Sequence, residues 1–222
     1  MFEAFVRDLV DARRDEQRLT ALLSTGDPLG EAADILPFMR TARHLAAWLG
    51  RANSSLGDVD LLAMEKPLLG GFRCDIAIGD SETGQFTLVE LEDAKANSVF
   101  EPVRGRDYPR WSRRFERGFS QLVDWAWRID HERQPSATLA AAFGTADPKF
   151  HYVLVIGRDR WIGDAGRARL NWRRLHNGIS GQRTTLWTYD DLLTFVRVRL
   201  RAAERDASAL IRTSRETGLG PD

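Results

Sequence analysis

Cysteine is nearly absent from this sequence of 222 residues, since Cys74 is the only one, and no disulfide can therefore form within the chain. Its place in a segment of alternating apolar residues predicts a buried thiol rather than a nucleophile. The four histidines are scattered, without the short spacings that zinc ligands require. These shortages exclude a disulfide-stapled scaffold and give no indication of a zinc site.

Long apolar runs and glycine-rich phosphate loops are also missing. No stretch approaches the roughly 20 apolar residues that span a bilayer, and the first residues, MFEAFVRDLVDARRDEQ, carry charges through their apolar positions, unlike a signal peptide. No Walker-type or G-x-G-x-x-G pattern follows a predicted strand. We therefore expect a cytoplasmic protein without a membrane partner.

The sequence has no excess of positive or negative charge. Its 32 Lys and Arg residues balance 32 Asp and Glu residues, which gives a formal net charge of zero. A neutral chain has no overall attraction to nucleic acid, so any surface that binds a phosphate backbone must be local. Lysine itself occurs only at positions 66, 95 and 149, and the basic side chains are mostly arginines.

Residues 71–95 are the most informative segment, and they read as two strands joined by a turn-rich loop at residues 80–84. In the first strand the period of two places Asp75 on the face opposite an apolar set. That apolar set is Phe72, Cys74, Ile76 and Ile78. In the second strand one face carries Phe86, Leu88, Glu90 and Glu92, while Thr87, Val89 and Leu91 share the other.

Antiparallel pairing of these strands brings Asp75 close to the level of Glu90, with Glu92 on the same face as Glu90. Carboxylates that converge in this way repel one another unless they share a proton or bind a cation. Oxygen ligands of this kind suit Mg²⁺ or Mn²⁺. An ordinary hairpin with outward acidic residues is the competing interpretation, but the apolar residues beside Glu90 indicate a partly buried face, where unpaired charge is costly.

An Asp on one strand followed by Glu90-x-Glu92 on the next resembles the PD-(D/E)xK nuclease superfamily. Glu92 stands where that pattern usually has Lys, although some restriction endonucleases of the superfamily carry Glu-x-Glu. Residues 65–95, Gln121 and a closing YVLVIGR…RLNWRRL…LWTYDDLL pattern also resemble the Shedu anti-phage defence nucleases. The resemblance covers residues 58–197 and is more specific than the acidic core alone.

The resemblance implies a metal-dependent DNA endonuclease of prokaryotic defence. It implies that Asp75 and Glu90 hold Mg²⁺ or Mn²⁺, and that Glu92 is a further ligand or the base. Lys95 would stabilise charge electrostatically, which requires the strand to bend after Asp93. Further acids on the preceding segments are open: Glu65 is more simply a solvated residue before a turn, and neither Glu31 nor Asp34 has a neighbour that marks it.

Residues 110–133 predict a helix with an apolar face for the core. Its flank would carry a stripe of residues suited to a phosphate backbone, namely Arg110, Arg114, Arg117, Gln121 and Trp125. The Gln121-x-x-x-Trp125 spacing resembles the Gln-x-x-x-Tyr motif of RecB-like nucleases. A solvated arginine-rich face is the equally supported alternative.

The remaining pattern predicts helices at residues 2–23 and 31–51, the second broken or restarted at Pro37, a strand at 59–65 and a loop at 96–109. A short helix at 137–143, a buried strand at 152–156, a helix at 165–177, a strand at 184–187 and a helix at 189–207 follow. The expected fold class is α/β: a restriction-endonuclease-like mixed sheet flanked by helices.

We expect an N-terminal helical segment at residues 1–52, a nuclease domain at 53–212 and a disordered tail at 213–222. Two other functions stay open. One is an inactive relative that binds nucleic acid or a partner without cutting, as the missing Glu-x-Lys allows. The other is an assembly subunit, a homo-oligomer in which the helical segment mediates association.

Overall fold

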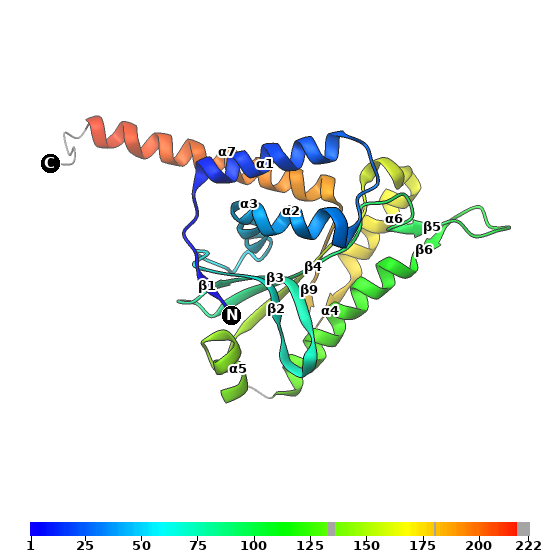
Figure 1. Cartoon of the computed structure of the whole chain (residues 1–222), viewed down its shortest axis with the longest axis horizontal. Helices are drawn as coiled ribbons and strands as arrows, with labels where there is room; N and C mark the ends of the chain where they lie inside the picture. The colour runs from blue at the N-terminus through cyan, green and yellow to red at the C-terminus, as the bar shows by residue number, and fades with distance from the viewer. Residues whose placement is uncertain (133–135, 180, 217–222) are drawn as a thin grey trace.

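A mixed six-stranded sheet forms the centre of the molecule in the computed structural model, which describes residues 1–132, 136–179 and 181–216 (Figure 1). The strand order is β1-β2-β3-β4-β7-β10. These strands are β1 (Glu3–Ala4), β2 (Leu61–Pro67), β3 (Arg73–Asp80), β4 (Gln85–Leu91), β7 (Lys149–Val155) and β10 (Thr185–Trp187). β1 to β4 pair antiparallel, whereas β4, β7 and β10 are parallel. The predicted mixed α/β fold is therefore confirmed.

Helices cover both faces of this sheet. On one face lie α1 (Leu9–Ser24), the π-helix η1 (Glu31–Ile35), α2 (Leu36–Thr41), α3 (Arg43–Trp48), η2 (Leu49–Ala52) and α7 (Tyr189–Glu216). On the other lie α4 (Arg113–His131), α5 (Ala137–Phe143) and α6 (Gly163–His176). Short 3-10 turns occur at η3 (Leu69–Gly71) and η4 (Asp159–Trp161). Each face of the sheet thus closes a separate hydrophobic core.

Successive side chains along each strand enter opposite cores, as a sheet covered on both faces requires. Ile76 pairs with Val89 and both enter the core beneath α1 and α7, whereas the next pair, Ala77 and Leu88, enters the core beneath α4. β7, the predicted buried strand, lies between β4 and β10. The β7-α6-β10 crossover expected from the sequence is confirmed.

The N-terminal helix begins at Leu9, so the predicted helix at residues 2–23 is wrong for its first turns. The Asp8 carboxylate accepts a hydrogen bond from Asp11 N at 2.9 Å and caps α1. Phe2 instead crosses to the other core, where its ring lies 5.5 Å from that of Phe86. Phe2 and Phe5 therefore flank the edge strand β1 and pack on opposite cores, rather than sharing one helix face.

The second helical region restarts near Pro37 as expected, because the π-helix η1 ends at Ile35 and α2 begins at Leu36. It breaks again at Ala42, with φ −97° and ψ 54°. Pro37 lies in the first turn of α2, where a missing backbone N–H costs nothing. The predicted strand at residues 59–65 is displaced slightly toward the C-terminus and becomes β2.

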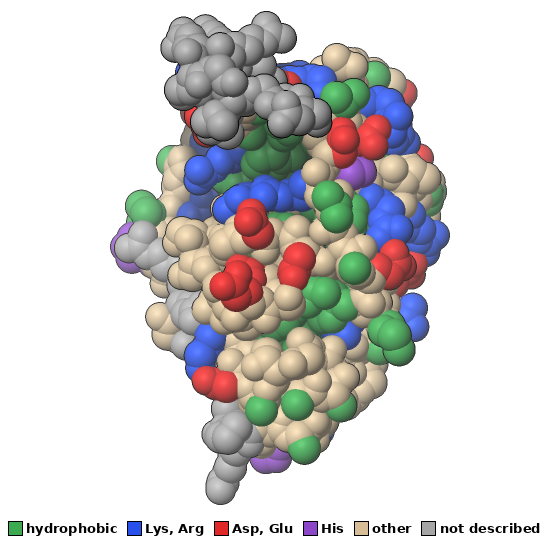
Figure 2. Space-filling view, turned by 90° about the vertical axis from the view of Figure 1, so that its left-hand side faces the viewer, with side chains coloured by type: hydrophobic (Ala, Val, Ile, Leu, Met, Phe, Trp, Pro, Cys, Tyr) green, Lys and Arg blue, Asp and Glu red, His purple; other side chains and the backbone are tan. Residues whose placement is uncertain are grey.

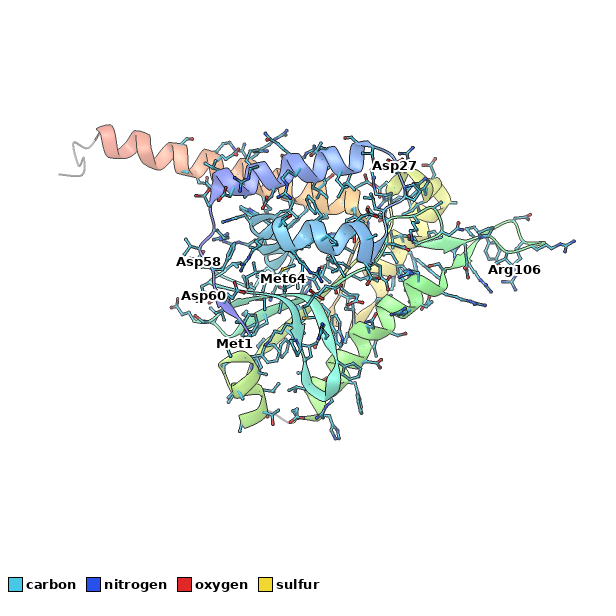
Figure 3. All side chains as sticks on the ribbon, viewed as in Figure 1. Met1, Asp27, Asp58, Asp60, Met64 and Arg106 are labelled. Atoms are coloured by element: carbon cyan, nitrogen blue, oxygen red, sulfur yellow. The ribbon has the colours of Figure 1, made fainter. Side chains whose placement is uncertain are left out.

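Residues 96–111 are more ordered than a loop. They contain β5 (Phe100–Glu101), which pairs with β6 (Arg110–Trp111), and the connection between them projects from the body of the molecule, with Arg106 near its tip (Figures 1 and 3). α4 therefore begins at Arg113 and not at residue 110. Ser112 ends the strand and caps the helix by accepting from Phe115 N at 2.9 Å.

The last helix, α7, extends to Glu216, further than the predicted residues 189–207. The expected disordered tail at 213–222 overlaps this helix, and residues 217–222 lie outside the described residues. The sequence pattern did not predict the short antiparallel pair formed by β8 (Gly178–Ile179) and β9 (Gln182–Arg183). No helix in the described part of the chain is long and apolar enough to cross a membrane.

Candidate functional site

Asp75 and Glu90 meet where β3 and β4 run side by side. The ladder pairs Ile76 with Val89, and the same register carried one step further sets Asp75 opposite Glu90. Asp75 Oδ2 also accepts a hydrogen bond from Leu91 N at 2.7 Å, which fixes the carboxylate against the end of β4. The convergence that the alternation predicted is confirmed.

The predicted apolar face of β3 is wrong at Phe72 and Cys74, because both pack on the core beneath α4 and not with Ile76. On the neighbouring strand β2, Met64 pairs with Ile76 and Lys66 with Cys74, but Asp75 has no partner in this ladder. The residue between them, Glu65, adopts a positive φ of 48°. A left-handed residue interrupts the pleat, so the side-chain alternation shifts. Cys74 is a free buried thiol, as expected, and burial raises its pKa.

Burial, together with repulsion from neighbouring acids, raises the pKa values of the two strand carboxylates. The pKa of Asp75 rises to about 7, mainly by desolvation, with Glu31 and Glu65 adding repulsion. The pKa of Glu90 rises to about 10 through desolvation and then repulsion from Asp75 and Glu92. Among the described residues, Glu90 has neither a hydrogen bond nor an ion pair, so a proton or a cation must neutralise it at neutral pH.

Glu92 lies beside this pair but has a partner of its own. It is 1% exposed, and its Oε2 accepts from Arg114 Nη1 at 2.8 Å. Desolvation outweighs this ion pair and raises the pKa of Glu92 to about 7. The same guanidinium contacts Glu31 Oε2 at 3.0 Å and Asp93 Oδ2 at 3.4 Å. Arg114 therefore joins Glu31 of η1 to the consecutive residues Glu92 and Asp93 after β4.

Glu31 is the site residue that sequence reasoning failed to single out. Its charge acts on Asp75, Glu90 and Glu92, because the π-helix η1 brings it over the ends of β3 and β4. Asp34, the other candidate of that segment, instead accepts from Gly30 N at 2.7 Å. No signal in the sequence separates the two. We refer below to Glu31, Asp75, Glu90, Glu92 and Asp93 as the acidic cluster.

Lys95 lies at the edge of the acidic cluster, with its Nζ 3.3 Å from Asp93 Oδ2 and about half of its side chain exposed. β4 ends at Leu91, and Ala94 then forms a bridge with Leu29, so the chain leaves strand geometry before Lys95. Strict alternation, which would have pointed Lys95 away, does not apply here.

Glu65 is held at the margin by Arg40, whose Nε donates to Glu65 Oε2 at 2.8 Å. Its positive φ and its repulsion of Asp75 set it apart from an ordinary solvated residue.

The stripe predicted on the flank of α4 is only partly present. Arg110 lies in β6 and pairs with Glu101 at 2.7 Å, and Trp125 is 1% exposed in the core. Both assignments to a helix flank are wrong, because the helix starts three residues later and Trp125 faces the sheet. Arg117 is exposed, and its charge lowers the pKa values of Glu90 and Glu92.

Gln121 is the remaining member of that predicted stripe. Its Oε1 is buried and has no hydrogen-bond partner among the described residues. An unpaired amide oxygen at this place is an unusual feature for a folded protein, because burial without a partner costs free energy.

A cavity of about 320 Å³ opens beside the start of α4. Its lining comprises Asn97, Glu101, Ser112, Arg113, Arg114 and Arg117. Arg114 thus contacts the acidic cluster and the cavity at once, and the exposed Arg113 and Arg117 give the cavity a basic wall. This arrangement suits an anionic ligand approaching the acidic cluster.

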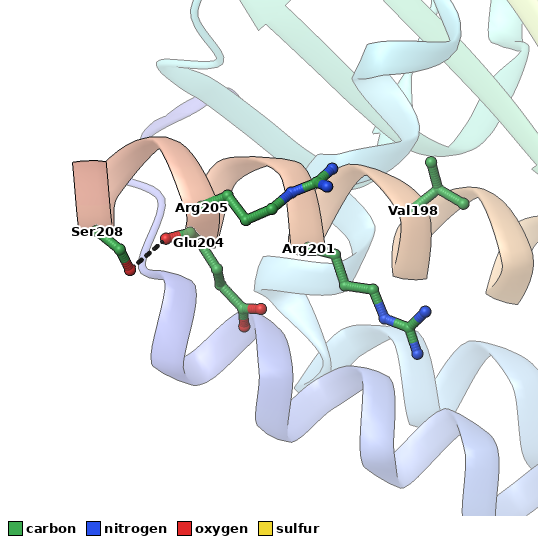
Figure 4. Close-up of a pocket in the computed structure, with 5 residues that line it drawn as sticks. All are labelled: Val198, Arg201, Glu204, Arg205 and Ser208. Carbon is green, nitrogen blue, oxygen red and sulfur yellow. Dashed lines mark hydrogen bonds between the residues drawn. The ribbon is translucent and has the colours of Figure 1, made fainter. Parts of the chain in front are cut away.

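A larger cavity, of about 650 Å³, lies along α7, and its described lining residues all belong to that helix (Figure 4). No residue of the acidic cluster lines it. The face shown in Figure 2 carries acidic side chains near its centre and basic ones beside them, with Asp58 and Asp60 at that edge of the molecule in Figure 3. The described residues on this face form no continuous basic surface.

The acidic cluster offers limited ligands for a metal. Among the described residues, no three His, Cys, Asp or Glu side chains are arranged to hold an ion. Two largely buried carboxylates, Asp75 and Glu90, do lie together, and within the described part of the chain only one of their oxygens accepts a hydrogen bond. Mg²⁺ is commonly held by one or two carboxylates, with waters and substrate phosphates completing its shell, so this donor set fits such an ion.

Comparison with known proteins gives one family. The model described as "Shedu protein SduA, C-terminal" matches residues 30–193, which include the whole acidic cluster and all of α4. No curated protein matches the chain.

Proposed function

The chain belongs to the family of Shedu SduA C-terminal domains, and from this premise we propose that it is a divalent-metal-dependent nuclease of anti-phage defence, with DNA as its substrate. The membership supports the defence role. The acidic cluster supports phosphodiester hydrolysis, through the PD-(D/E)xK pattern that Asp75 and Glu90 resemble.

The pairing of Asp75 with Glu90 is the observation that carries this proposal. Both side chains are largely buried, the charge of Asp75 raises the pKa of Glu90, and Glu90 has no partner within the described residues. Asp75 is held in place by Leu91 N, so its free oxygen and the Glu90 carboxylate are the groups that would hold Mg²⁺ or Mn²⁺. Such an ion supplies charge stabilisation at the phosphate and lowers the pKa of a bound water.

Glu92 and Arg114 act together in this proposal. Arg114 holds the Glu92 carboxylate in one orientation and leaves its second oxygen without an Arg114 contact. A carboxylate whose pKa is raised to about 7 is suited to accept a proton from water near neutral pH. Glu92 is thus the base or a further ligand, and Lys95 stabilises negative charge at the edge of the site.

Binding of the nucleic acid falls to the basic wall of the cavity beside α4. Arg117 and Arg113 are exposed and have no carboxylate partners among the described residues. Guanidinium groups in that state are available for phosphate oxygens. Gln121 retains its predicted role in positioning the strand, since its amide oxygen lacks a partner in the described residues.

Cleavage assays test the proposal directly. With Mg²⁺ or Mn²⁺, the wild-type protein should cut DNA, and Glu90→Gln should lose at least about 100-fold in rate, because a ligand or base is removed. Glu82→Gln, in the exposed turn between β3 and β4, is the matched control and should cut normally. A wild-type protein that cuts no nucleic acid with either ion would refute the proposal.

Metal binding has a readout of its own. Mg²⁺ or Mn²⁺ should raise the melting temperature of the wild-type protein, because an ion that binds only the folded state stabilises it. Asp75→Asn should abolish this gain while keeping the acceptor for Leu91 N. Asp60→Asn, which alters a half-buried carboxylate that accepts from Ser81 N at 2.9 Å, should keep it. An equal gain in all three proteins would remove Asp75 from the metal site.

An inactive relative that binds nucleic acid without cutting is the second candidate. Its support is Glu92 itself, which replaces the usual lysine and is engaged by Arg114. Binding that survives chelation, together with no cleavage under either ion, would favour this candidate. Association into a homo-oligomer also remains a proposal, and sedimentation of the purified chain tests it.

A further inference from the structure

A second pocket, of about 410 Å³, lies between the start of α4 and helix α6. Its lining comprises Trp111, Arg169, Trp172, Arg173 and Asn177. None of these residues belongs to the acidic cluster, and none carries a role in the proposed hydrolysis. Pockets of this volume commonly hold small ligands or one unit of a polymer.

Tryptophan supplies the flat surfaces of this pocket. The Trp172 side chain is 63% exposed, whereas most tryptophan side chains in folded proteins are largely buried. Its indole stacks on His176, with ring centroids 4.3 Å apart and planes 15° from parallel, which fixes the ring at the rim. Trp111 packs between Phe100 at 4.5 Å and Phe115 at 4.6 Å. Rigid exposed rings are platforms on which nucleobases stack.

Two arginines in the pocket differ in their availability. Arg173 is committed, because its guanidinium makes two hydrogen bonds to Glu116, of 2.7 and 3.2 Å. Arg169 donates to the backbone oxygen of Pro109 and lies over the Trp111 ring, 5.3 Å from its centroid. No carboxylate pairs with Arg169 among the described residues. Its positive charge is therefore free for an anionic group of a ligand.

Asn177 adds a polar donor that lacks a partner. Its Nδ2 is buried and has no hydrogen bond within the described residues, although its backbone N–H is bonded to Arg173 O at 2.9 Å. A buried donor left without an acceptor costs free energy, which a ligand bearing an acceptor would recover. The pocket thus offers stacking, a free cation and one unmatched donor.

We propose that this pocket binds one nucleotide unit, with its base on Trp172, its phosphate on Arg169 and a base-edge acceptor at Asn177. The inference rests on the proposed function, because it makes the unit an unpaired or terminal nucleotide of the nucleic acid that is cut. The position supports this reading. Trp111 directly precedes Ser112, Arg113 and Arg114, which line the cavity beside the acidic cluster.

A free nucleotide has the same chemistry as an unpaired nucleotide of a strand, so the test includes both. The full chain in chelator is titrated with nucleosides, with nucleoside 5′-monophosphates and with a short 5′-phosphorylated single strand, by calorimetry and tryptophan fluorescence. We expect the single strand to bind tighter than the monophosphate. We expect the nucleoside to bind weaker than its monophosphate in the wild type, and no such difference in Arg169→Gln.

Trp172→Ala should weaken binding of the strand by about 10-fold or more, the scale of base stacking. Trp127→Ala is the matched control, because Trp127 on α4 is 60% exposed and also stacks on a histidine, His131, with centroids 5.7 Å apart. It should bind as the wild type does. Asn177→Leu should weaken binding without loss of stability, since no protein partner within the described residues is lost.

Equal affinities in Trp172→Ala and Trp127→Ala would overturn the inference, and so would a wild-type protein that binds neither strand nor monophosphate. Tighter binding of the monophosphate than of the strand would assign the pocket to a free nucleotide and refute the substrate source. Failure of the proposed function looks different. In that case no DNA is cut under either metal ion, yet Trp172→Ala still weakens binding of the strand.

Discussion

Arg114 Nη1 lies 2.8 Å from Glu92 Oε2, so a cation from α4 meets the one strand position where this chain has Glu and the superfamily pattern has Lys. The contact is largely enclosed on the acid's side, where the Glu92 side chain is 1% exposed. A buried carboxylate is stable in its charged form only with such a partner. Helix α4 therefore supplies the compensating positive charge that the strand lacks.

Removal of either partner should destabilise the protein. We expect Arg114→Gln to lower the free energy of unfolding by about 2 kcal/mol, less than for a fully enclosed pair because part of the arginine is exposed. Glu92→Gln and the double variant complete a cycle in which the two changes together cost less than their sum. Arg110→Gln, which loses an exposed pair with Glu101, should cost about 0.5 kcal/mol or less. Additive effects in denaturant titrations would contradict a direct coupling.

The raised carboxylate pKa values predict that the metal-free protein loses stability as pH rises. The folded-state pKa values of Asp75 and Glu92, about 7, and of Glu90, about 10, exceed the ordinary values of 3.8 and 4.5. The folded state therefore holds more protons than the unfolded state, and these groups lower the free energy of unfolding from about pH 4 upward. Glu90→Gln should flatten that decline.

Unfolding measured in chelator at a series of pH values checks this prediction. His151 acts in the opposite direction, because burial lowers its pKa to about 4 and its contribution increases with pH between about 4 and 6.5. That contribution is present in both proteins and cancels in the difference between wild type and Glu90→Gln. Identical pH profiles for the two proteins would contradict the assigned repulsion.

The hairpin was predictable because local chemistry fixes it. Asp80 Oδ1 accepts from Glu82 N at 3.0 Å and from Thr83 N at 3.1 Å, which is the turn behaviour expected of an Asp followed by small polar residues. The turn sets the register, and the register sets Asp75 opposite Glu90. Alternation alone therefore carried the central pair of the site.

The rest of the site depends on contacts that no local pattern encodes. Arg114 reaches Glu31, which is 83 residues away in the chain, and this contact exists only because η1 and α4 pack against the same end of the sheet. The failed placement of Trp125 has a similar cause. The sheet determines which face of α4 is buried, and Trp125 lies on that face. The pairing of β5 with β6 holds residues 110 and 111 in a strand, so α4 begins at Arg113.

Arg117 is expected to contact the phosphate backbone, whereas Arg114 is committed to the acidic cluster. Arg117→Gln should weaken DNA binding and reduce the slope of log affinity against log salt by about 0.9, the value for one contact to B-DNA. Folding should be unaffected, because Arg117 is exposed and has no ion pair among the described residues. Arg201→Gln, in the cavity along α7, is the control and should change neither quantity. An unaltered slope for Arg117→Gln would show that this arginine is a solvated surface residue without a phosphate contact.

Lys95 decides whether the edge of the acidic cluster takes part in cleavage. Its ammonium lies 3.3 Å from Asp93 Oδ2, and its side chain is 49% exposed, so a phosphate entering the site can recruit it. Lys95→Ala should reduce the cleavage rate by about 10-fold or more through lost electrostatic stabilisation. Stability should change by about 0.5 kcal/mol or less, because a half-exposed ion pair contributes little. Lys95→Arg, which keeps the charge, should retain most of the rate.

Lys149 provides the matched comparison, since it is also 49% exposed and pairs with an aspartate, Asp147, at 2.8 Å, but lies at the start of β7 away from the acidic cluster. Lys149→Ala should cleave at the wild-type rate. If Lys95→Ala does the same, Lys95 is a surface residue and the charge at this edge comes from Arg114 alone. If Glu92→Gln also cleaves normally, the proton acceptor must be sought elsewhere in the acidic cluster, and Glu31, which contacts Arg114 at 3.0 Å, is the residue to substitute next.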